Sequence, residues 1–112
     1  MKYNRVYLTA LGYELGPQVV TSAELEARLA PVYQDLSIQP GQLEAWTGIA
    51  ERRWWQPAAR LSAGATVAAQ KALSKTSVRA ADLGVVIYAG VCRENFEPAT
   101  ACAVAAALGG RG

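Results

Sequence analysis

The 112-residue sequence contains no histidine, so it cannot by itself build a Cys–His, Ser–His or zinc–His site. It contains only two cysteines, Cys92 and Cys102. Two cysteines without a secretory signal indicate a cytoplasmic protein with free thiols. We expect both to be small buried hydrophobic residues rather than nucleophiles. The sequence therefore predicts no metal site and no cysteine nucleophile.

Charge is also scarce. Charged residues make up 18% of the chain and the net charge is +2, which does not by itself indicate a nucleic-acid partner. An apolar content of 52% is typical of one packed domain and too high for disorder. With so few charges, part of the surface must be apolar, and we expect a partner or the rest of a larger protein to cover it.

Long hydrophobic runs are absent. The first 16 residues lack the apolar core of a signal peptide, and charges interrupt the other apolar segments before membrane-spanning length. The glycines match no phosphate-binding spacing. We therefore expect no membrane span and a cytoplasmic location.

The pattern predicts a layered α/β fold in the order β, α, α, β, α. Residues 5–15 are expected to form a strand that ends at Gly16–Pro17. Residues 19–36 carry a capping box, Thr21 with Glu24, and an apolar stripe broken by Pro31. The stripe is formed by Leu25, Leu29, Tyr33 and Leu36.

The second half of the chain is expected to continue the alternation. Residues 42–60 suggest a short helix and a loop, and Ser62 is expected to cap a helix through residue 76. The continuous apolar run 83–90 predicts a strand covered on both faces, as in a parallel sheet. After a loop, Pro98 is expected to be the first residue of a helix that runs to Gly109–Gly110.

Three polar residues are candidates for a site. Glu97 lies where the loop after the apolar strand meets the next helix, and its carboxylate could simply cap that helix. Arg52 and Arg53 precede two tryptophans, a combination that could bind phosphate or stack on bases. A structural loop with salt bridges and anchored tryptophans explains the same cluster.

Several of these motifs, in this order, resemble one family. The segments LEAWTGIAERRWW and ADLGVVIYAGVCRENFEPATACAVAAALG are similar to the N-terminal part of β-ketoacyl-ACP synthase III-type enzymes of the thiolase superfamily. The Arg52–Arg53 pair and the sequence from Glu97 to Thr100 look most like the OleA-type acyl-CoA condensing enzymes. The resemblance covers essentially the whole chain.

The resemblance implies a five-layered αβαβα fold, a homodimer, and a chain that represents about the first third of the enzyme. It places the nucleophilic cysteine on a turn downstream of Gly112, with its His and Asn or His partners further on. In OleA-type enzymes the glutamate that matches Glu97 reaches across the dimer interface and is proposed as the base for condensation. Where synthase III enzymes hold the CoA adenine with a Trp and an Arg, this chain has Gln42 and Trp46.

The function implied is acyl transfer and Claisen condensation of two fatty acyl-CoA molecules to a β-keto product. The chain alone would be inactive, its substrates would be acyl-CoA or acyl-ACP, and no other cofactor is expected. Decarboxylative condensation by a 3-oxoacyl-ACP synthase III is the alternative chemistry. A free-standing α/β interaction module is the non-enzymatic alternative.

Overall fold

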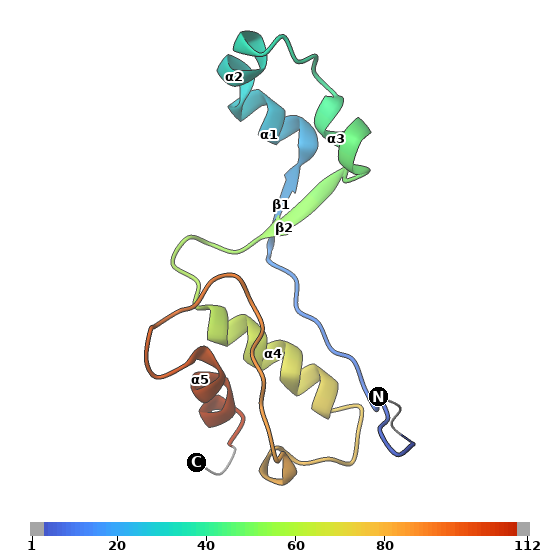
Figure 1. Ribbon diagram of the computed structural model, residues 1–112, viewed down its shortest axis with the longest axis vertical. Coiled ribbons are helices and arrows are strands. Elements are labelled where there is room, and N and C mark those ends of the chain that lie inside the picture. Colours follow the sequence, from blue (N-terminus) through green and yellow to red (C-terminus); the bar gives the residue numbers. More distant parts are fainter. Residues whose placement is uncertain (1–3, 110–112) are drawn as a thin grey trace. The chain divides into compact units, whose positions relative to one another are not determined.

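The computed structural model describes residues 4–109, which form two compact units. We call residues 15–57 the hairpin unit, and residues 4–14 together with 58–109 the helical unit. Figure 1 shows the elements of both.

The hairpin unit is built on two antiparallel strands, β1 and β2, with three short helices between them (Figure 1). Gln18 pairs with Trp54 at one end of the hairpin, and Thr21 pairs with Glu51 at the other. A Cβ atom on Gly16 would lie 2.4 Å from the Trp54 carbonyl carbon, so this close backbone approach requires glycine. The elements are β1 Gln18–Thr21, α1 Ser22–Arg28, α2 Ala30–Asp35, α3 Gln42–Thr47 and β2 Glu51–Trp54.

The capping box is confirmed at the start of α1. The Thr21 hydroxyl accepts a hydrogen bond from the Glu24 N–H at 3.1 Å, and the Glu24 carboxylate accepts from the Thr21 N–H at 2.7 Å. The predicted interruption at Pro31 is also confirmed, because α1 ends at Arg28 and α2 begins at Ala30.

The apolar stripe is only half covered. Leu25 and Tyr33 are partly buried, but the Leu29 and Leu36 side chains are 43% and 65% exposed. The restart at Leu29 explains this, since a broken helix does not keep one continuous face over its whole length.

The position of the first strand is a correction. Residues 5–15 form no strand, and β1 follows the Gly16–Pro17 step instead of ending at it. Residues 5–15 have no ladder partner in the described chain; the Leu11 carbonyl accepts from Lys75 Nζ at 2.9 Å, and Glu14 forms an ion pair with Lys71. The strand β2 was missed, because residues 42–60 were expected to contain only a short helix and a loop.

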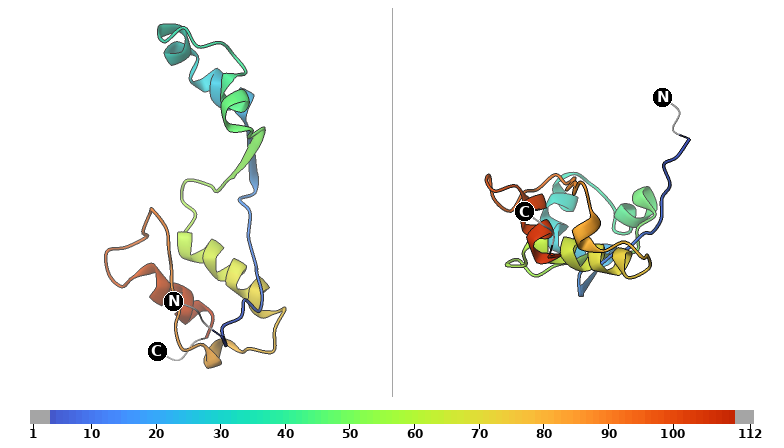
Figure 2. Two further views of the ribbon diagram at one scale, coloured as in Figure 1. Left: turned by 45° about the vertical axis from the view of Figure 1, so that its right-hand side comes forward. Right: turned by 90° about the horizontal axis from the view of Figure 1, so that it is seen from below.

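The helical unit contains two helices that lie side by side in both views of Figure 2. Its elements are α4 Leu61–Leu73, a 3₁₀ turn η1 Ala80–Asp82, and α5 Thr100–Ala107. Ser62 is not the cap of α4; the cap position is Arg60, and Ser62 lies within the first turn. Its N–H is satisfied by the Glu94 carboxylate, so no side-chain cap from a neighbouring residue is needed.

The predicted strand at 83–90 is a second correction. These residues are not in a hydrogen-bonded strand, because no other segment among residues 4–109 pairs with them. Val86 and Tyr88 are partly buried, whereas Val85 and Ile87 are 76% and 83% exposed. This alternation is typical of extended backbone covered on one face only, so the expected cover on both faces is not present in the described chain.

The helix at the end of the chain also begins later than expected. α5 starts at Thr100 rather than Pro98, and its first helical hydrogen bond runs from Cys102 N to the Ala99 carbonyl. It ends before Gly109, whose φ of 75° suits glycine at a helix C-terminus, as predicted. Gly110 lies outside the described residues.

Little apolar surface is buried. Among the described residues, Val20 and Val104 are the fully buried hydrophobic side chains, at 1% and 5% exposure. Large apolar side chains such as Tyr7, Leu8 and Phe96 are 78%, 78% and 85% exposed. The expectation of an apolar surface is therefore confirmed. Within residues 4–109, no helix combines the length and apolarity needed to cross a membrane.

Candidate functional site

Glu97 lies on an irregular segment between the extended residues 83–90 and α5, which we call the Glu97 loop (residues 91–99). The loop borders an open cavity of about 350 Å³. The cavity is lined by Tyr88, Gly90, Val91, Cys92, Arg93, Asn95, Phe96, Glu97, Ala99, Thr100 and Ala101. The Glu97 side chain is exposed, so the carboxylate is accessible beside this cavity.

Glu97 does not cap α5. The cap residue is Ala99, which makes no side-chain cap hydrogen bond, and none of the hydrogen bonds found among residues 4–109 involves the Glu97 carboxylate. The simple structural explanation for this residue is therefore not supported by the geometry.

The loop is held by contacts at its two ends. The Tyr88 hydroxyl donates to the Cys92 carbonyl at 3.4 Å, and the Glu94 N–H donates to the Thr100 hydroxyl at 3.3 Å. Within the loop, the Arg93 guanidinium lies over the Phe96 ring, 5.4 Å from its centroid.

Glu94 is the strongest anchor of the loop. Its Oε2 accepts from the Ser62 N–H at 3.0 Å, and its Oε1 lies 2.6 Å from Arg60 Nε. Hydrogen bonds from Ser62, with a smaller contribution from Arg60, hold the pKa of Glu94 below its ordinary value. The carboxylate therefore stays ionised and fixed at the start of α4.

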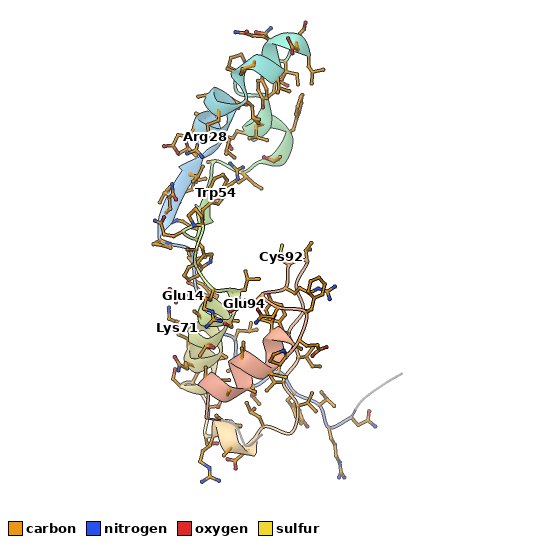
Figure 3. The ribbon with its side chains drawn as sticks, turned by 90° about the vertical axis from the view of Figure 1, so that its left-hand side faces the viewer. Glu14, Arg28, Trp54, Lys71, Cys92 and Glu94 are labelled. Atoms are coloured by element: carbon orange, nitrogen blue, oxygen red, sulfur yellow. The ribbon has the colours of Figure 1, made fainter. Side chains whose placement is uncertain are left out.

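Both cysteines are exposed free thiols, which corrects the expectation that they are buried. Figure 3 shows Cys92 on the loop that also carries Glu94. Cys102 lies on α5. Both thiols are exposed because few side chains cover this part of the chain: among the described residues, only Val20 and Val104 are buried hydrophobic residues.

Arg52 and Arg53 lie on β2 in the hairpin unit and are directed to different partners. Arg52 Nη2 donates to the Ser22 hydroxyl at 3.2 Å, while its Nη1 is buried without a hydrogen-bond partner among the described residues. The Ser22 hydroxyl in turn donates to the Ile49 carbonyl. Arg53 forms an exposed ion pair with Glu51 at 3.5 Å.

The tryptophans of this cluster support the structural explanation in part. Trp54 lies under the Arg28 guanidinium, which is 5.6 Å from its ring centroid (Figure 3). Arg52, Arg53 and Trp54 lie on strand β2 rather than on the expected loop, and Trp55 directly follows the strand. Gln42 is partly buried at the start of α3, and Trp46 on the same helix is 66% exposed.

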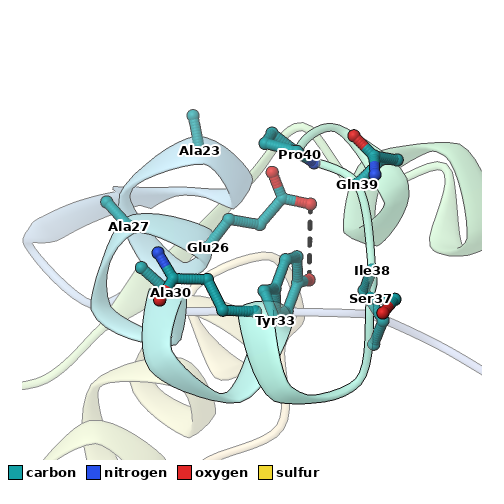
Figure 4. Close-up of a pocket in the computed structure, with 10 residues that line it drawn as sticks. Ala23, Glu26, Ala27, Ala30, Tyr33, Ser37, Ile38, Gln39 and Pro40 are labelled. Atoms are coloured by element: carbon teal, nitrogen blue, oxygen red, sulfur yellow. Dashed lines mark hydrogen bonds between the residues drawn. The ribbon is translucent and has the colours of Figure 1, made fainter.

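Glu26 forms a second site, which the sequence did not reveal. Glu26 is only 8% exposed. Its carboxylate accepts hydrogen bonds from the N–H groups of Gly41 and Leu43, both at 2.7 Å. The Tyr33 hydroxyl donates to it at 3.4 Å (Figure 4). The backbone hydrogen bond from Gly41, then that from Leu43, lowers the pKa of Glu26. In the sequence, the spacing of seven residues between Glu26 and Tyr33, about two helical turns, is the feature that would have suggested this contact.

The groove beside Glu26 has a volume of about 630 Å³. Small side chains of α1 and residues of the α2–α3 loop form its walls (Figure 4). Because both oxygens of the Glu26 carboxylate accept hydrogen bonds from donors of its own chain, we assign this carboxylate a structural role. Among residues 4–109, no group of three or more acidic or cysteine side chains gathers that could hold a metal ion.

Sequence comparison places this chain among condensing enzymes. It is 59% identical over 109 residues to the acyl-CoA:acyl-CoA alkyltransferase of Shewanella oneidensis, covering 97% of this chain and 31% of the relative. It is 35% identical over 109 residues to the enzyme of the same description from Xanthomonas campestris. The β-ketoacyl-ACP synthase III of Bordetella petrii is 35% identical over 101 residues. No protein-family model matches.

Solved structures give the same result. The acetamide-bound OleA of Xanthomonas campestris matches 92% of this chain with a TM-score of 0.82 at 35% identity. The 3-oxoacyl-ACP synthase III of Xanthomonas oryzae matches 92% with a TM-score of 0.83 at 34% identity. This chain covers 32% and 30% of those two structures, and about a third of the length of the curated relatives.

The fold is therefore a mixed α/β arrangement that matches about 30% of the length of each of these enzymes. The chain belongs with the OleA- and β-ketoacyl-ACP synthase III-like condensing enzymes of the thiolase superfamily, and it corresponds to their N-terminal part.

Proposed function

We propose that the complete enzyme joins two fatty acyl-CoA molecules by Claisen condensation. The observation that carries this proposal is the 59% identity to an acyl-CoA:acyl-CoA alkyltransferase over 97% of this chain. The proposal includes the five-layered αβαβα fold, a homodimer and a cytoplasmic location.

The reaction has two steps. In the first, a cysteine thiolate attacks the thioester carbonyl of one acyl-CoA, the carbon–sulfur bond to CoA breaks, and CoA leaves as its thiolate. In the second, a base removes the α-proton of the second acyl-CoA, and the resulting carbanion attacks the acyl-enzyme carbonyl. A carbon–carbon bond forms, and the enzyme thiolate leaves. We propose that the nucleophilic cysteine lies downstream of Gly112, and that neither Cys92 nor Cys102 serves this role.

Glu97 is the proposed base for the second step. Its carboxylate is exposed beside the 350 Å³ cavity and is not used to cap α5. By analogy with the OleA-type enzymes, we propose that it lies at the dimer interface, directed towards the active site of the partner subunit. A carboxylate becomes a stronger base where water is excluded, and an acyl tunnel formed by the rest of the enzyme would provide that environment.

Arg52 and Arg53 are proposed to lie near a phosphate of CoA. Arg53 is the better candidate, because its ion pair with Glu51 is exposed and its side chain is 39% accessible. An exposed pair of this kind contributes little to stability and is easily exchanged for another anion. Nη1 of the Arg52 guanidinium makes no hydrogen bond within residues 4–109.

The exchange Glu97→Ala in the complete enzyme tests the base. We expect condensation to fall by roughly 10² to 10⁴-fold, the usual contribution of a positioned general base. Acylation of the nucleophile should remain within about threefold of wild type, because that step needs no α-proton transfer. Mass spectrometry of the acyl-enzyme measures the first step, and chromatography of the β-keto product measures the second.

Glu44→Gln is the matched control, since Glu44 is exposed on α3 and its side chain makes none of the contacts described for the site. Unchanged condensation in Glu97→Ala would show that Glu97 is not the base. A loss of acylation equal to the loss of condensation would also contradict the assignment.

Decarboxylative condensation is the second candidate. It is favoured by the two synthase III enzymes described above, which are 35% and 34% identical in sequence to this chain. There, a carbon–carbon bond of malonyl-ACP breaks, CO₂ leaves and the carbanion forms without a base. Product formation from acyl-CoA and malonyl-ACP, with none from two acyl-CoA molecules, would establish this chemistry instead.

A further inference from the structure

One short-range hydrogen bond joins the Glu97 loop to the start of α5. The N–H of Glu94 donates to the hydroxyl of Thr100 at 3.3 Å, so the two ends of the segment that contains Glu97 are joined. Thr100 is 5% exposed and is the first residue of α5, which makes it a firm attachment point. Glu97 lies midway between these two residues, without anchoring contacts of its own side chain in the described structure.

The same residue ties the loop to a second helix. The Glu94 carboxylate reaches the first turn of α4, 32 positions away in sequence, where it accepts from Ser62 N–H and pairs with Arg60. Its side chain is 13% exposed, whereas that of Arg60 is 73% exposed. The first turn of a helix has free N–H groups and a partial positive charge, so a carboxylate there is strongly held. α4 has 13 residues and is the longest element described.

Glu94 is therefore a single junction of three segments. Its side chain contacts α4, its backbone contacts α5, and the chain that follows it carries Glu97. A general base must lie within about 2.6–3.2 Å of the heavy atom whose proton it removes, or act through one water. A displacement of about 1 Å can lower the rate roughly 10²-fold.

We propose that Glu94 is a positioning residue for condensation, which fixes the Glu97 loop against α4 and α5 so that Glu97 reaches the α-carbon of the second substrate. This inference rests on the proposed role of Glu97 as the base. It assigns Glu94 no contact with substrate.

The test uses Glu94→Ala and Thr100→Val in the complete enzyme. Glu94→Ala removes the link to α4, and Thr100→Val removes the acceptor that closes the loop. We expect each to lower the rate of condensation about 10- to 100-fold and to leave acylation within about threefold of wild type. We also expect Glu94→Gln to retain more of the wild-type condensation rate than Glu94→Asp. The glutamine amide oxygen can still accept from the Ser62 N–H, whereas the shorter aspartate side chain does not reach it.

A double-mutant cycle separates positioning from general stability. If Glu94 acts through Glu97, Glu94→Ala should have no further effect on condensation in a Glu97→Ala enzyme. Fully additive losses in the double variant would overturn the proposal. Equal losses of acylation and condensation in both Glu94→Ala and Thr100→Val would overturn it as well.

The outcomes also distinguish this inference from the proposed function. Normal condensation by Glu97→Ala refutes the base itself. Loss of condensation in Glu97→Ala together with normal condensation in Glu94→Ala and Thr100→Val refutes only the positioning role. Faster amide hydrogen exchange at residues 95–99 in Glu94→Ala, with unchanged exchange in the hairpin unit, would support the junction directly.

Discussion

Two carboxylates in this chain accept backbone N–H groups from segments that are distant in sequence. Glu26 binds Gly41 and Leu43, and Glu94 binds Ser62. Such charge-assisted bonds are shorter and stronger than neutral ones, and they hold a loop where its own residues cannot. At the scale of single residues, these two side chains each join segments that lie 15 or more positions apart.

Glu26 predicts a pH dependence of stability. Its pKa is lower in the folded protein than in the unfolded chain, chiefly because of the hydrogen bond from Gly41. Its contribution is therefore fully present above the unfolded value of about 4.3, and it is lost as the pH falls through the lower folded value. Glu26→Gln should lower the urea midpoint at pH 7, and the difference from wild type should shrink at pH 3.

Tryptophan fluorescence of the complete enzyme measures this transition, because Trp46, Trp54 and Trp55 all lie in the hairpin unit. A variant of the complete enzyme that lacks Trp46, Trp54 and Trp55 gives the fluorescence of any other tryptophans, and that signal is subtracted. Glu44→Gln serves as the control for an exposed glutamate. An equal difference between Glu26→Gln and wild type at both pH values would contradict the role assigned to the charge.

At the scale of elements, helix α1 is the best defined by its own sequence. Thr21 and Glu24 satisfy each other's N–H groups through a capping box of four residues, and one contact from further away, the Ser22 N–H to the Ala50 carbonyl at 2.8 Å, adds to it. The start of α4 is the opposite case. Its cap residue, Arg60, makes no side-chain cap bond, and the helix depends on Glu94.

Thr21→Ala should destabilise the hairpin unit by about 1 kcal/mol, with a range of roughly 0.5–2 kcal/mol, because the hydroxyl acceptor of the capping box is lost. Thr21→Ser keeps that acceptor and should stay within about 0.5 kcal/mol of wild type. Urea unfolding of the complete enzyme, followed by tryptophan fluorescence, gives both values. Equal stability of the alanine and serine variants would show that the box contributes nothing.

At the scale of the whole molecule, the dominant feature is exposed apolar surface. Residues 4–15 and 83–96 carry many of the exposed large side chains, and the run 83–90 has no strand partner within residues 4–109. Extended apolar segments with unpaired N–H and C=O groups are templates for further pairing. This surface is consistent with burial against the rest of a condensing enzyme.

We expect residues 1–112, produced alone, to aggregate or to bind a hydrophobic dye strongly, because so few apolar side chains are buried. Light scattering and dye fluorescence measure this, and the complete enzyme is the control. A monomeric, cooperatively unfolding product would favour the free-standing interaction module instead. Intact mass of the natural protein would show directly whether a longer chain carries these residues.

Much of the family assignment was available from the sequence. The order of the motifs from the TGI segment at Thr47 to the Glu97–Pro98 step indicated condensing enzymes, and the comparisons confirmed it. The capping box and the restart at Pro31 were predictable for a local reason, since every group involved lies within a few residues. Glu97 was identified as the candidate base, and that role stays a prediction.

The strands and the supporting carboxylates could not be read from local pattern. Residues 83–90 have the composition of a buried strand, but a strand forms only where another backbone segment pairs with it, and the sequence does not name that partner. Likewise, serine is a residue type favoured at helix caps, yet Ser62 lies inside α4 and its N–H donates to the Glu94 carboxylate, 32 positions away. The sequence by itself determined the family, the local helix signals and the candidate base. Only the tertiary structure decided which backbone groups pair and which carboxylate holds the Glu97 loop, because those contacts join residues far apart along the chain.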